Sequence, residues 1–207
     1  MTFGSREDAG RQLGEYLLQN GVEADLVLGL PRGGVVVAAE VARLLHRPLD
    51  IVVVRKLGHP RHREFAVGAL AEGGVVVLDQ AAIEATHVIP RELEEIIAEE
   101  KARLEEYQLK FGHRTPPIFA GKTVVLVDDG LATGATMEAA VLSASQREAS
   151  KVKVAVPVAS ESACERLERV ASEVLAISID PAFEAVGRYY EQFTQTADEE
   201  VIELLRQ

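Results

Sequence analysis

The sequence predicts an α/β fold in which helices cover both faces of a mostly parallel central sheet. Short runs of Val, Ile and Leu are typical of strands buried on both faces, and stretches with helical spacing of apolar residues alternate with them. The predicted strands cover residues 26–30, 51–54, 124–127, 152–158 and 174–179. Ligands of such sheets bind beyond the carboxyl ends of the strands, so the loops there are the first place to look for a site.

Four helices are predicted to flank these strands. Ser5 begins a segment that resembles a capping box, and the first helix extends to about Gln19. Apolar residues at helical spacing predict a second helix, which Pro48 terminates. Two more are expected, one that ends at about Arg147 and one over about residues 161–170.

A basic segment follows the second predicted strand. Residues 55–63 read Arg-Lys-Leu-Gly-His-Pro-Arg-His-Arg, without any acid, in a chain whose formal net charge is -11. We interpret this segment either as a solvated basic loop or as a local anion site. Two further strands, at 65–70 and 75–78, are expected to be joined around Gly73 and Gly74.

A helical insertion is predicted at about residues 80–115. Within it, residues 89–111 place apolar side chains near one helical face, among many glutamates. This pattern favours a long amphipathic surface helix. A dimer contact and partial cover of the site remain as alternatives.

Length and composition narrow the class of protein. A chain of 207 residues is expected to form a single domain, with a C-terminal segment at about 180–207. No apolar run approaches the roughly 20 residues of a membrane span, and the first residues lack the features of a signal peptide. Cys164 is the only cysteine, which excludes an internal disulfide and favours the cytoplasm. The net charge of -11 disfavours nucleic acid and anionic membranes as partners.

The most informative stretch is the loop after the strand at 124–127. Asp128 and Asp129 end this buried strand, where two carboxylates are costly unless they meet water, a cation or hydroxyl groups. Small residues then leave the backbone accessible to an anion, and the next helix adds a partial positive charge at its N-terminus. A ribose 5-phosphate offers both the hydroxyls and the phosphate that such a loop would bind.

This stretch resembles the diphosphoribosyl-binding signature of the type I phosphoribosyltransferases. The shared pattern is an apolar strand, two acids, two linking residues and a loop of small residues and threonines. Gly130 departs from it, because that family more often has an aliphatic residue or serine there. The resemblance implies that Asp128 and Asp129 are catalytic and contact the ribose hydroxyls, and that Asp128 stabilises positive charge on the ribose. It further implies that the 5-phosphate of 5-phospho-α-D-ribosyl 1-diphosphate (PRPP) is bound by Ala132, Thr133, Gly134, Ala135 and Thr136.

A second anion loop is predicted after the first strand. Gly33 and Gly34 permit close approach of the backbone, and Arg32 offers a multidentate contact to phosphate. The resemblance implies that this loop binds pyrophosphate. Arg55 and Lys56 are similar to a pair that precedes a mobile lid in the orotate-specific branch, which implies pyrophosphate binding for them as well.

The C-terminal segment contains a group of aromatic residues. Tyr189, Tyr190 and Phe193 are expected to pack locally against the sheet, whereas Phe183 is the candidate for stacking on a flat base. The order of Phe183, Val186-Gly187 and the aromatic residues that follow is similar, with a shift of one residue after Phe183, to the tail of the hypoxanthine-guanine branch, where a phenylalanine stacks on the purine. The segment at about 180–207 is therefore expected to form a small hood-like addition.

The resemblance implies an enzyme of the glycosyltransferase (pentosyltransferase) type, active in nucleotide salvage. It would move ribose 5-phosphate from PRPP to a nitrogenous base, with a purine favoured, and release pyrophosphate. Mg²⁺ is the expected cofactor, held mainly by PRPP and also by Asp128 and Asp129. A homodimer is expected. The alternative is a non-catalytic regulatory protein with the same fold that senses PRPP or a nucleotide.

Overall fold

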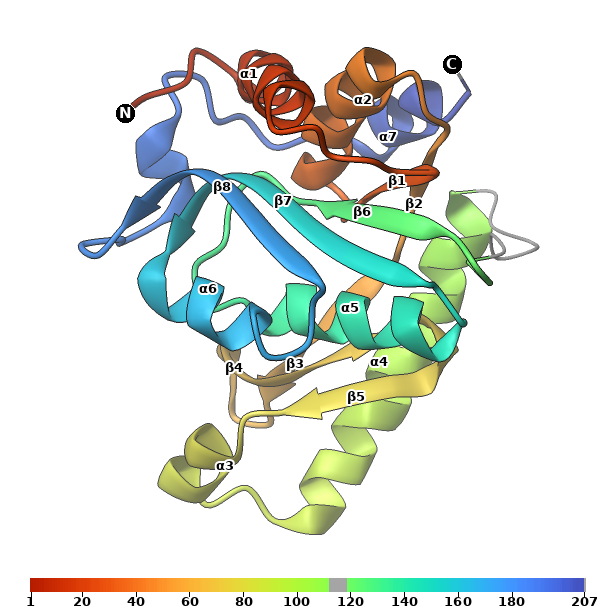
Figure 1. Cartoon of the computed structure of the whole chain (residues 1–207). Coiled ribbons are helices and arrows are strands. Elements are labelled where there is room, and N and C mark those ends of the chain that lie inside the picture. Colours follow the sequence, from red (N-terminus) through yellow and green to blue (C-terminus); the bar gives the residue numbers. More distant parts are fainter. Residues whose placement is uncertain (112–118, 207) are drawn as a thin grey trace.

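A five-stranded parallel sheet forms the centre of the structure (Figure 1). The computed structural model describes residues 1–111 and 119–206. The strand order is β2-β1-β6-β7-β8, and each neighbouring pair is parallel. The strands are β1 (Leu26–Gly29), β2 (Leu49–Ile51), β6 (Thr123–Val127), β7 (Lys151–Ser160) and β8 (Glu173–Asp180). The predicted fold class is therefore confirmed.

Helices cover both faces of this sheet, as the alternation of strands and helices predicts. One face carries α1 (Arg6–Gln19) and α2 (Gly33–Leu45), and the other carries α5 (Ala135–Gln146) and α6 (Glu161–Leu167) (Figure 1). The Ser5 hydroxyl caps α1 by accepting a hydrogen bond from the amide of Asp8.

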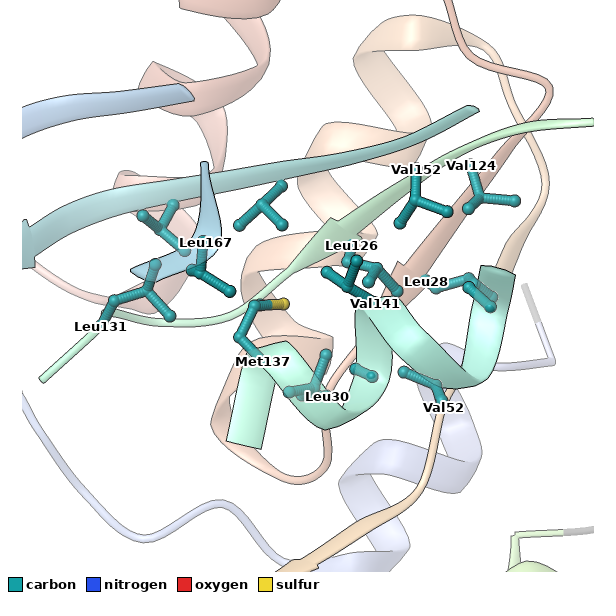
Figure 2. Packing of buried hydrophobic residues seen from close by; sticks show 14 of the residues in the cluster. Leu28, Leu30, Val52, Val124, Leu126, Leu131, Met137, Val141, Val152 and Leu167 are labelled. Carbon is teal, nitrogen blue, oxygen red and sulfur yellow. The ribbon is translucent and has the colours of Figure 1, made fainter. Parts of the chain in front are cut away.

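An apolar cluster joins α5 to the central sheet. Met137 and Val141 of α5 pack against Leu28, Leu126 and Val152 of three neighbouring strands (Figure 2). These five side chains are at most 4% exposed. Burial of each contributes about 1.5–3 kcal/mol, so this layer fixes the position of the loops at both ends of β6.

A second, antiparallel sheet lies on the far side of α5 (Figure 1). Its order is β3-β4-β5, and its strands are β3 (Val54–His59), β4 (His62–Ala71) and β5 (Val75–Leu78). Ala139 of α5 packs against Ala69, Ala71 and Val75. Since α5 is covered by a sheet on each side, small residues at this contact allow close approach.

Two predictions about residues 51–63 are wrong. The predicted strand at 51–54 is divided, because β2 ends at Ile51 and β3 begins at Val54 in the other sheet. Most of the basic segment forms the two arms of the β3–β4 hairpin, in which His59 pairs with His62. The basic composition predicted a loop, because these residues lack the apolar periodicity of a strand. In the structure, pairing between β3 and β4 supplies the backbone hydrogen bonds of both strands.

A glycine pair turns the chain between β4 and β5, through the short helix η1 (Glu72–Gly74). Gly73 and Gly74 have φ angles of 80° and 78°, a region that favours glycine. The predicted pairing of these two strands around Gly73 and Gly74 is confirmed.

The predicted helical insertion is present as α3 (Gln80–Thr86) and α4 (Pro90–Lys110). The bounds of α4 agree with the amphipathic helix predicted at 89–111. Its buried residues Ile96 and Leu104 pack in one cluster with Leu57 of the hairpin. The predicted end of the insertion, near residue 115, lies outside the described residues.

The C-terminal segment returns to the central sheet and to α1. It forms η2 (Val186–Tyr189) and α7 (Asp198–Leu204), and α7 lies beside α2 (Figure 1). Phe3 forms a β-bridge with Tyr190, and their ring centroids are 5.6 Å apart. The first residues and the C-terminal segment are therefore joined. None of the described helices is long and apolar enough to cross a membrane.

Candidate active site

Two loops meet at the carboxyl ends of β1 and β6. These strands are parallel neighbours, and Gly29 at the end of β1 pairs with Val127 at the end of β6. The loop after β1 therefore runs beside the loop that carries Asp128 and Asp129. The sequence predicts an anion loop after each strand, and the strand order makes the two loops adjacent.

Two glycines allow the first loop to approach the acidic pair, Asp128 and Asp129. A Cβ atom at Gly34 would lie 2.7 Å from Asp128 Oδ1 and 2.9 Å from its Cα atom. A Cβ atom at Gly33 would collide with Asp129 Oδ2 and with Arg6. Both glycines therefore let the backbone of this loop lie against the acidic pair, while their predicted contact with pyrophosphate stays a prediction.

The acidic pair is held in one turn and is poorly solvated. Asp128 Oδ1 accepts a hydrogen bond of 2.8 Å from the amide of Asp129. Burial raises the pKa of Asp128 well above its usual range, and the charge of Asp129 raises it further. Burial also raises the pKa of Asp129, against the opposing effect of Arg6. A cation or hydroxyl donors would therefore stabilise both carboxylates.

Arg6, the first residue of α1, supplies a cation to this pair. Its Nε donates to Asp129 Oδ2 at 2.7 Å, and its Nη1 donates to the Thr194 carbonyl oxygen at 2.6 Å. The guanidinium lies over the Phe193 ring, 4.0 Å from the centroid. The side chains of Arg6 and Asp129 are only 11% and 15% exposed, so salt screens this pair weakly. Arg6 therefore ties Asp129 to the C-terminal segment.

Tyr190 holds the main chain of the same acid. Its hydroxyl donates to the Asp129 carbonyl oxygen at 2.6 Å. Burial raises the pKa of Tyr190, and the nearby charge of Asp129 raises it further, so the hydroxyl remains a donor. Both the side chain and the main chain of Asp129 are thus fixed from outside their own loop.

A cavity of about 160 Å³, here called the phosphate-loop cavity, lies over the loop that follows the acidic pair. Its lining residues are Asp128, Gly130, Leu131, Ala132, Thr133, Gly134, Ala135, Thr136, Met137 and Val186. All the residues predicted to bind the 5-phosphate are among them. Gly134 has a φ of 73°, which lets the chain turn into α5 at Ala135.

Two outer contacts orient this loop. Ser160 Oγ donates to the Ala132 carbonyl oxygen at 2.6 Å, and Arg166 Nη1 donates to the Thr133 carbonyl oxygen at 3.1 Å. The carbonyl and the following amide of a trans peptide point in opposite directions, so the amides of Thr133 and Gly134 point away from these partners. An anion can therefore meet these amides at the start of α5, where the helix dipole favours negative charge.

A second cavity, of about 280 Å³, lies between the end of β1 and the start of β3. This two-arginine cavity is lined by Pro31, Arg32, Val53, Val54, Arg55 and Tyr107. Arg32 and Arg55, both predicted to bind pyrophosphate, therefore share one cavity. Arg32 also lies 3.7 Å from Asp198 of α7. Lys56 does not line the cavity, and its amino group donates to the Glu64 carbonyl oxygen at 3.0 Å.

Val186 of the C-terminal segment reaches the loop of the acidic pair. It lines the phosphate-loop cavity, and its Cγ1 atom would lie 2.8 Å from a Cβ atom at Gly130. Gly130, the departure from the family signature, is therefore explained by the space that Val186 occupies. Phe183 stacks instead on Tyr189, with ring centroids 5.2 Å apart and 22° between the planes.

The chain is similar to known proteins along most of its length. Residues 5–194 match the model of the phosphoribosyl transferase domain. The chain belongs to the phosphoribosyltransferase domain family. The matched range contains both loops of this phosphoribosyltransferase domain, and also Arg6 and Tyr190.

Similar sequences carry the same family name. Two proteins of Mycobacterium tuberculosis, from strains CDC 1551 and H37Rv, are each 43% identical to this phosphoribosyltransferase domain over 205 residues. Their names assign them provisionally as phosphoribosyl transferases. The alignments cover 98% of this chain and 46% of each relative, so the chain spans about half the length of the curated relatives it matches.

Solved structures extend the comparison. TT1426 from Thermus thermophilus is 47% identical, with a TM-score of 0.82 over 99% of this chain and 98% of that chain. The purine phosphoribosyltransferase from Pyrococcus horikoshii is 18% identical, with a TM-score of 0.50 over 93% of each chain. This second likeness shows the phosphoribosyltransferase fold alone.

The site also includes residues that were not predicted to belong to it. Arg6 and Tyr190 hold Asp129, and Val186 lines the phosphate-loop cavity. The sequence carried a weak signal for Val186, through the residue order similar to the hypoxanthine-guanine tail, and for Tyr190, as a member of an aromatic group expected to pack locally. Arg6 reads as an ordinary residue in the first turn of an amphipathic helix, because its partner lies in a distant segment.

Proposed function

We propose that this chain transfers ribose 5-phosphate from PRPP to a nitrogenous base and releases pyrophosphate. The position of the acidic pair between two cavities carries this proposal. Asp128 lines the phosphate-loop cavity and also lies against Gly34, in the loop that leads back to Arg32 and the two-arginine cavity. PRPP has a phosphate at one end, a diphosphate at the other and hydroxyls between them, which matches this order of groups.

Each predicted site residue has a place in the proposed complex. The loop at residues 132–136 binds the 5-phosphate through its amides and threonine hydroxyls. The ribose hydroxyls donate hydrogen bonds to the carboxylates of Asp128 and Asp129. The groups assigned to pyrophosphate are Arg32, Gly33, Gly34, Arg55 and Lys56. Lys56 must release the Glu64 carbonyl oxygen before it can take part.

The proposed reaction exchanges one bond at C1 of the ribose for another. The bond from C1 to the diphosphate oxygen breaks, and pyrophosphate leaves with the electron pair. A ring nitrogen of the base donates an electron pair to C1, and its proton then passes to water. Positive charge develops on the ribose ring meanwhile, and ionised Asp128 is placed to stabilise it. Catalysis comes mainly from placing both reactants and compensating charge.

Mg²⁺ suits this donor set as an ion bound together with PRPP. The carboxylates of Asp128 and Asp129 are hard oxygen ligands, which Mg²⁺ prefers. Across residues 1–111 and 119–206, no group of three or more His, Cys, Asp or Glu side chains could hold a metal ion. In the proposed complex, PRPP and water complete the ligands. When bound, the ion supplies positive charge to the diphosphate leaving group.

A purine is the proposed acceptor, and the C-terminal segment is its proposed contact. Phe183 and Val186 pack in one apolar cluster, and Val186 lines the phosphate-loop cavity. An aromatic ring at this position suits a flat base, which would lie between the C-terminal segment and the ribose.

Turnover tests the proposal directly. The protein is incubated with PRPP, Mg²⁺ and pooled purine and pyrimidine bases. We expect free pyrophosphate and a nucleotide mass that matches one base, and no product from a folded Asp129→Asn variant. Binding of PRPP without product across a broad panel of bases would favour the non-catalytic sensor. Failure to bind PRPP in a calorimetric titration would exclude both the transferase and a PRPP sensor, and would leave only a nucleotide sensor.

We also propose that residues 1–207 form one domain of this type. Its additions are the helical insertion at about 80–115 and the C-terminal segment at about 180–207. The family match over residues 5–194 supports this assignment. Limited proteolysis that leaves a single resistant fragment is the expected result. We propose that the protein is a cytoplasmic homodimer. Analytical ultracentrifugation would measure the number of subunits.

A further inference from the structure

Helix α4 and the β3–β4 hairpin are joined by ion pairs. Arg61 meets Glu92 at 3.4 Å, and Arg63 meets Glu99 at 2.6 Å. These four side chains are between 25% and 76% exposed, so the two pairs contribute little to stability. These pairs bring the basic hairpin and the acidic helix α4 together, but they do not indicate a function for either element.

The third pair, between Arg55 and Glu100, is different because the acid is buried. Glu100 is only 5% exposed, and both of its carboxylate oxygens are occupied. Its Oε2 accepts from Arg55 Nε at 2.9 Å, and its Oε1 accepts from Arg103 Nη1 at 2.7 Å. A buried ion pair seldom stabilises a fold more than apolar residues of similar size would. We therefore interpret this pair as one that orients the Arg55 side chain rather than one that stabilises the fold.

Helix α4 contacts the same guanidinium from a second position. The guanidinium carbon of Arg55 lies over the Tyr107 ring, 5.0 Å from its centroid. Glu100 and Tyr107 are seven residues apart, about two helical turns, so they lie on one face of α4. Leu104 lies between them and is buried in the core, which fixes this face toward the hairpin.

The residues that α4 contacts lie at the candidate site. Arg55 and Tyr107 both line the two-arginine cavity, together with Arg32 from the loop after β1. The described residues provide one hydrogen-bond partner for Arg55, and it is Glu100 at Nε. The terminal nitrogens of Arg55 are therefore available to an anion in the cavity, and α4 forms one of its walls.

We propose that Glu100 and Tyr107 are positioning residues that hold Arg55 at the two-arginine cavity, where it binds the diphosphate group of PRPP. This inference rests on the proposed function. It gives the acidic insertion a role at the site. Without these two contacts, the Arg55 guanidinium is free to turn along the basic hairpin into solvent.

Binding of three probes to the full chain tests this role. The probes are PRPP with Mg²⁺, inorganic pyrophosphate with Mg²⁺, and ribose 5-phosphate, which lacks the diphosphate. We expect Glu100→Gln to weaken binding of the first two about tenfold, through loss of a charge-assisted hydrogen bond. Tyr107→Leu removes the cation–π contact and weakens them about threefold. Ribose 5-phosphate should bind both variants like the wild type.

Matched variants separate positioning from general damage. Glu95→Gln alters an exposed pair with Arg91 on the same helix and should bind all three probes normally. Tyr107→Phe keeps the ring and should also bind normally. In an Arg55→Gln background, Glu100→Gln should have no further effect. If Glu100→Gln does not fold, Tyr107→Leu with its Phe control decides the question.

Three outcomes would overturn the inference. One is unchanged pyrophosphate affinity in the Glu100 and Tyr107 variants, another is an equal loss for ribose 5-phosphate, and the last is a wild type that does not bind pyrophosphate. Failure of the proposed function looks different. A wild type that binds pyrophosphate but neither PRPP nor ribose 5-phosphate contradicts that function, and the effect of the variants on pyrophosphate still decides the role of α4.

Discussion

Arg6 Nε lies 2.7 Å from Asp129 Oδ2, so the first residue of α1 is bonded to the second acid of the candidate site. The same guanidinium donates to the Thr194 carbonyl oxygen and packs on the Phe193 ring. One side chain therefore connects α1, the acidic pair and the C-terminal segment. Since Asp129 is proposed to bind the ribose, Arg6 should control how well that carboxylate is placed.

We expect Arg6→Gln to lower the affinity for PRPP about tenfold, because it removes a charge-assisted hydrogen bond to Asp129. Arg6→Lys keeps the charge but not the second contact with Thr194, so an intermediate loss is expected. Calorimetric titration with PRPP and Mg²⁺ measures both. Arg11→Gln on the same helix, whose pair with Asp8 is exposed, should bind normally. Normal binding by Arg6→Gln would contradict the assigned role.

Asp129→Asn should weaken PRPP binding more than it disturbs folding, because the amide keeps the shape of the side chain and loses its charge. In combination with Arg6→Gln, the two losses should be less than additive, since both act on one carboxylate. Titrations of the single and double variants measure this coupling, and strictly additive losses would show that the residues act separately.

Asp128→Asn is expected to stabilise the fold at neutral pH while it impairs PRPP binding. Burial raises the folded-state pKa of Asp128, so the folded state favours the protonated form. The associated stability is present below the unfolded-state pKa and is lost as the pH rises through the folded-state pKa. An amide cannot ionise. The variant should therefore melt at a higher temperature than the wild type at pH 7.

The pH dependence provides the check on this prediction. The difference in melting temperature between Asp128→Asn and the wild type should shrink as the pH falls toward about 4, where the wild-type carboxyl group is protonated. If Asp128→Asn melts at or below the wild-type temperature at pH 7, the ionised Asp128 carboxylate does not destabilise the folded state.

Gly130→Ala should destabilise the protein through Val186. The new Cβ atom would lie 2.8 Å and 3.0 Å from the two methyl carbons of Val186, whose branched side chain has little freedom to move. Overpacking of this kind costs about 1–3 kcal/mol. Adding Val186→Ala should recover most of the loss, as measured by chemical denaturation.

Gly4→Ala serves as the control for this pair. Its nearest contact would be 3.7 Å away, an ordinary van der Waals distance. It should change stability by no more than about 0.5 kcal/mol. If Val186→Ala brings no recovery to Gly130→Ala, the backbone of the loop, rather than the space beside Val186, requires the glycine.

Phe183→Ala is expected to raise the KM for the base about tenfold and to leave the Kd for PRPP unchanged, because stacking of a base on an aromatic ring is worth about 1–3 kcal/mol. Tyr189 should keep its place, since its hydroxyl donates to Asp180 at 2.7 Å. Initial-rate kinetics with the base identified by turnover measure this effect. Phe65→Ala, at an exposed phenylalanine of the hairpin, should have normal kinetics. A base KM within about twofold of the wild type would remove Phe183 from the acceptor site.

Local patterns in the sequence predicted the elements that build the central sheet. Strands buried on both faces require continuous apolar runs, and these are visible without any knowledge of the fold. The loop from Asp128 to Thr136 was equally visible, since a strand end, two acids and small residues are neighbours in the chain. The amphipathic helix α4 followed from its spacing alone.

The division of residues 51–54 between two sheets depended on the tertiary structure. The chain leaves the central sheet after Ile51 because the β3–β4 hairpin packs on the other side of α5, and no local signal marks that change. The register of the hairpin decides which residues of β3 and β4 pair through backbone hydrogen bonds. The basic composition of residues 55–63 carries no information about that register, so it did not predict the two strands.

The sequence by itself determined the fold class and the loop that resembles a PRPP-binding signature, because both rest on residues close together in the chain. Only the tertiary structure decided which distant groups complete the site. Arg6 meets Asp129, Val186 fills the space left by Gly130, and Arg55 is held by Glu100 of α4. Each contact joins segments that come together through the packing of whole layers, and charge or size at one position cannot specify a partner so far along the chain.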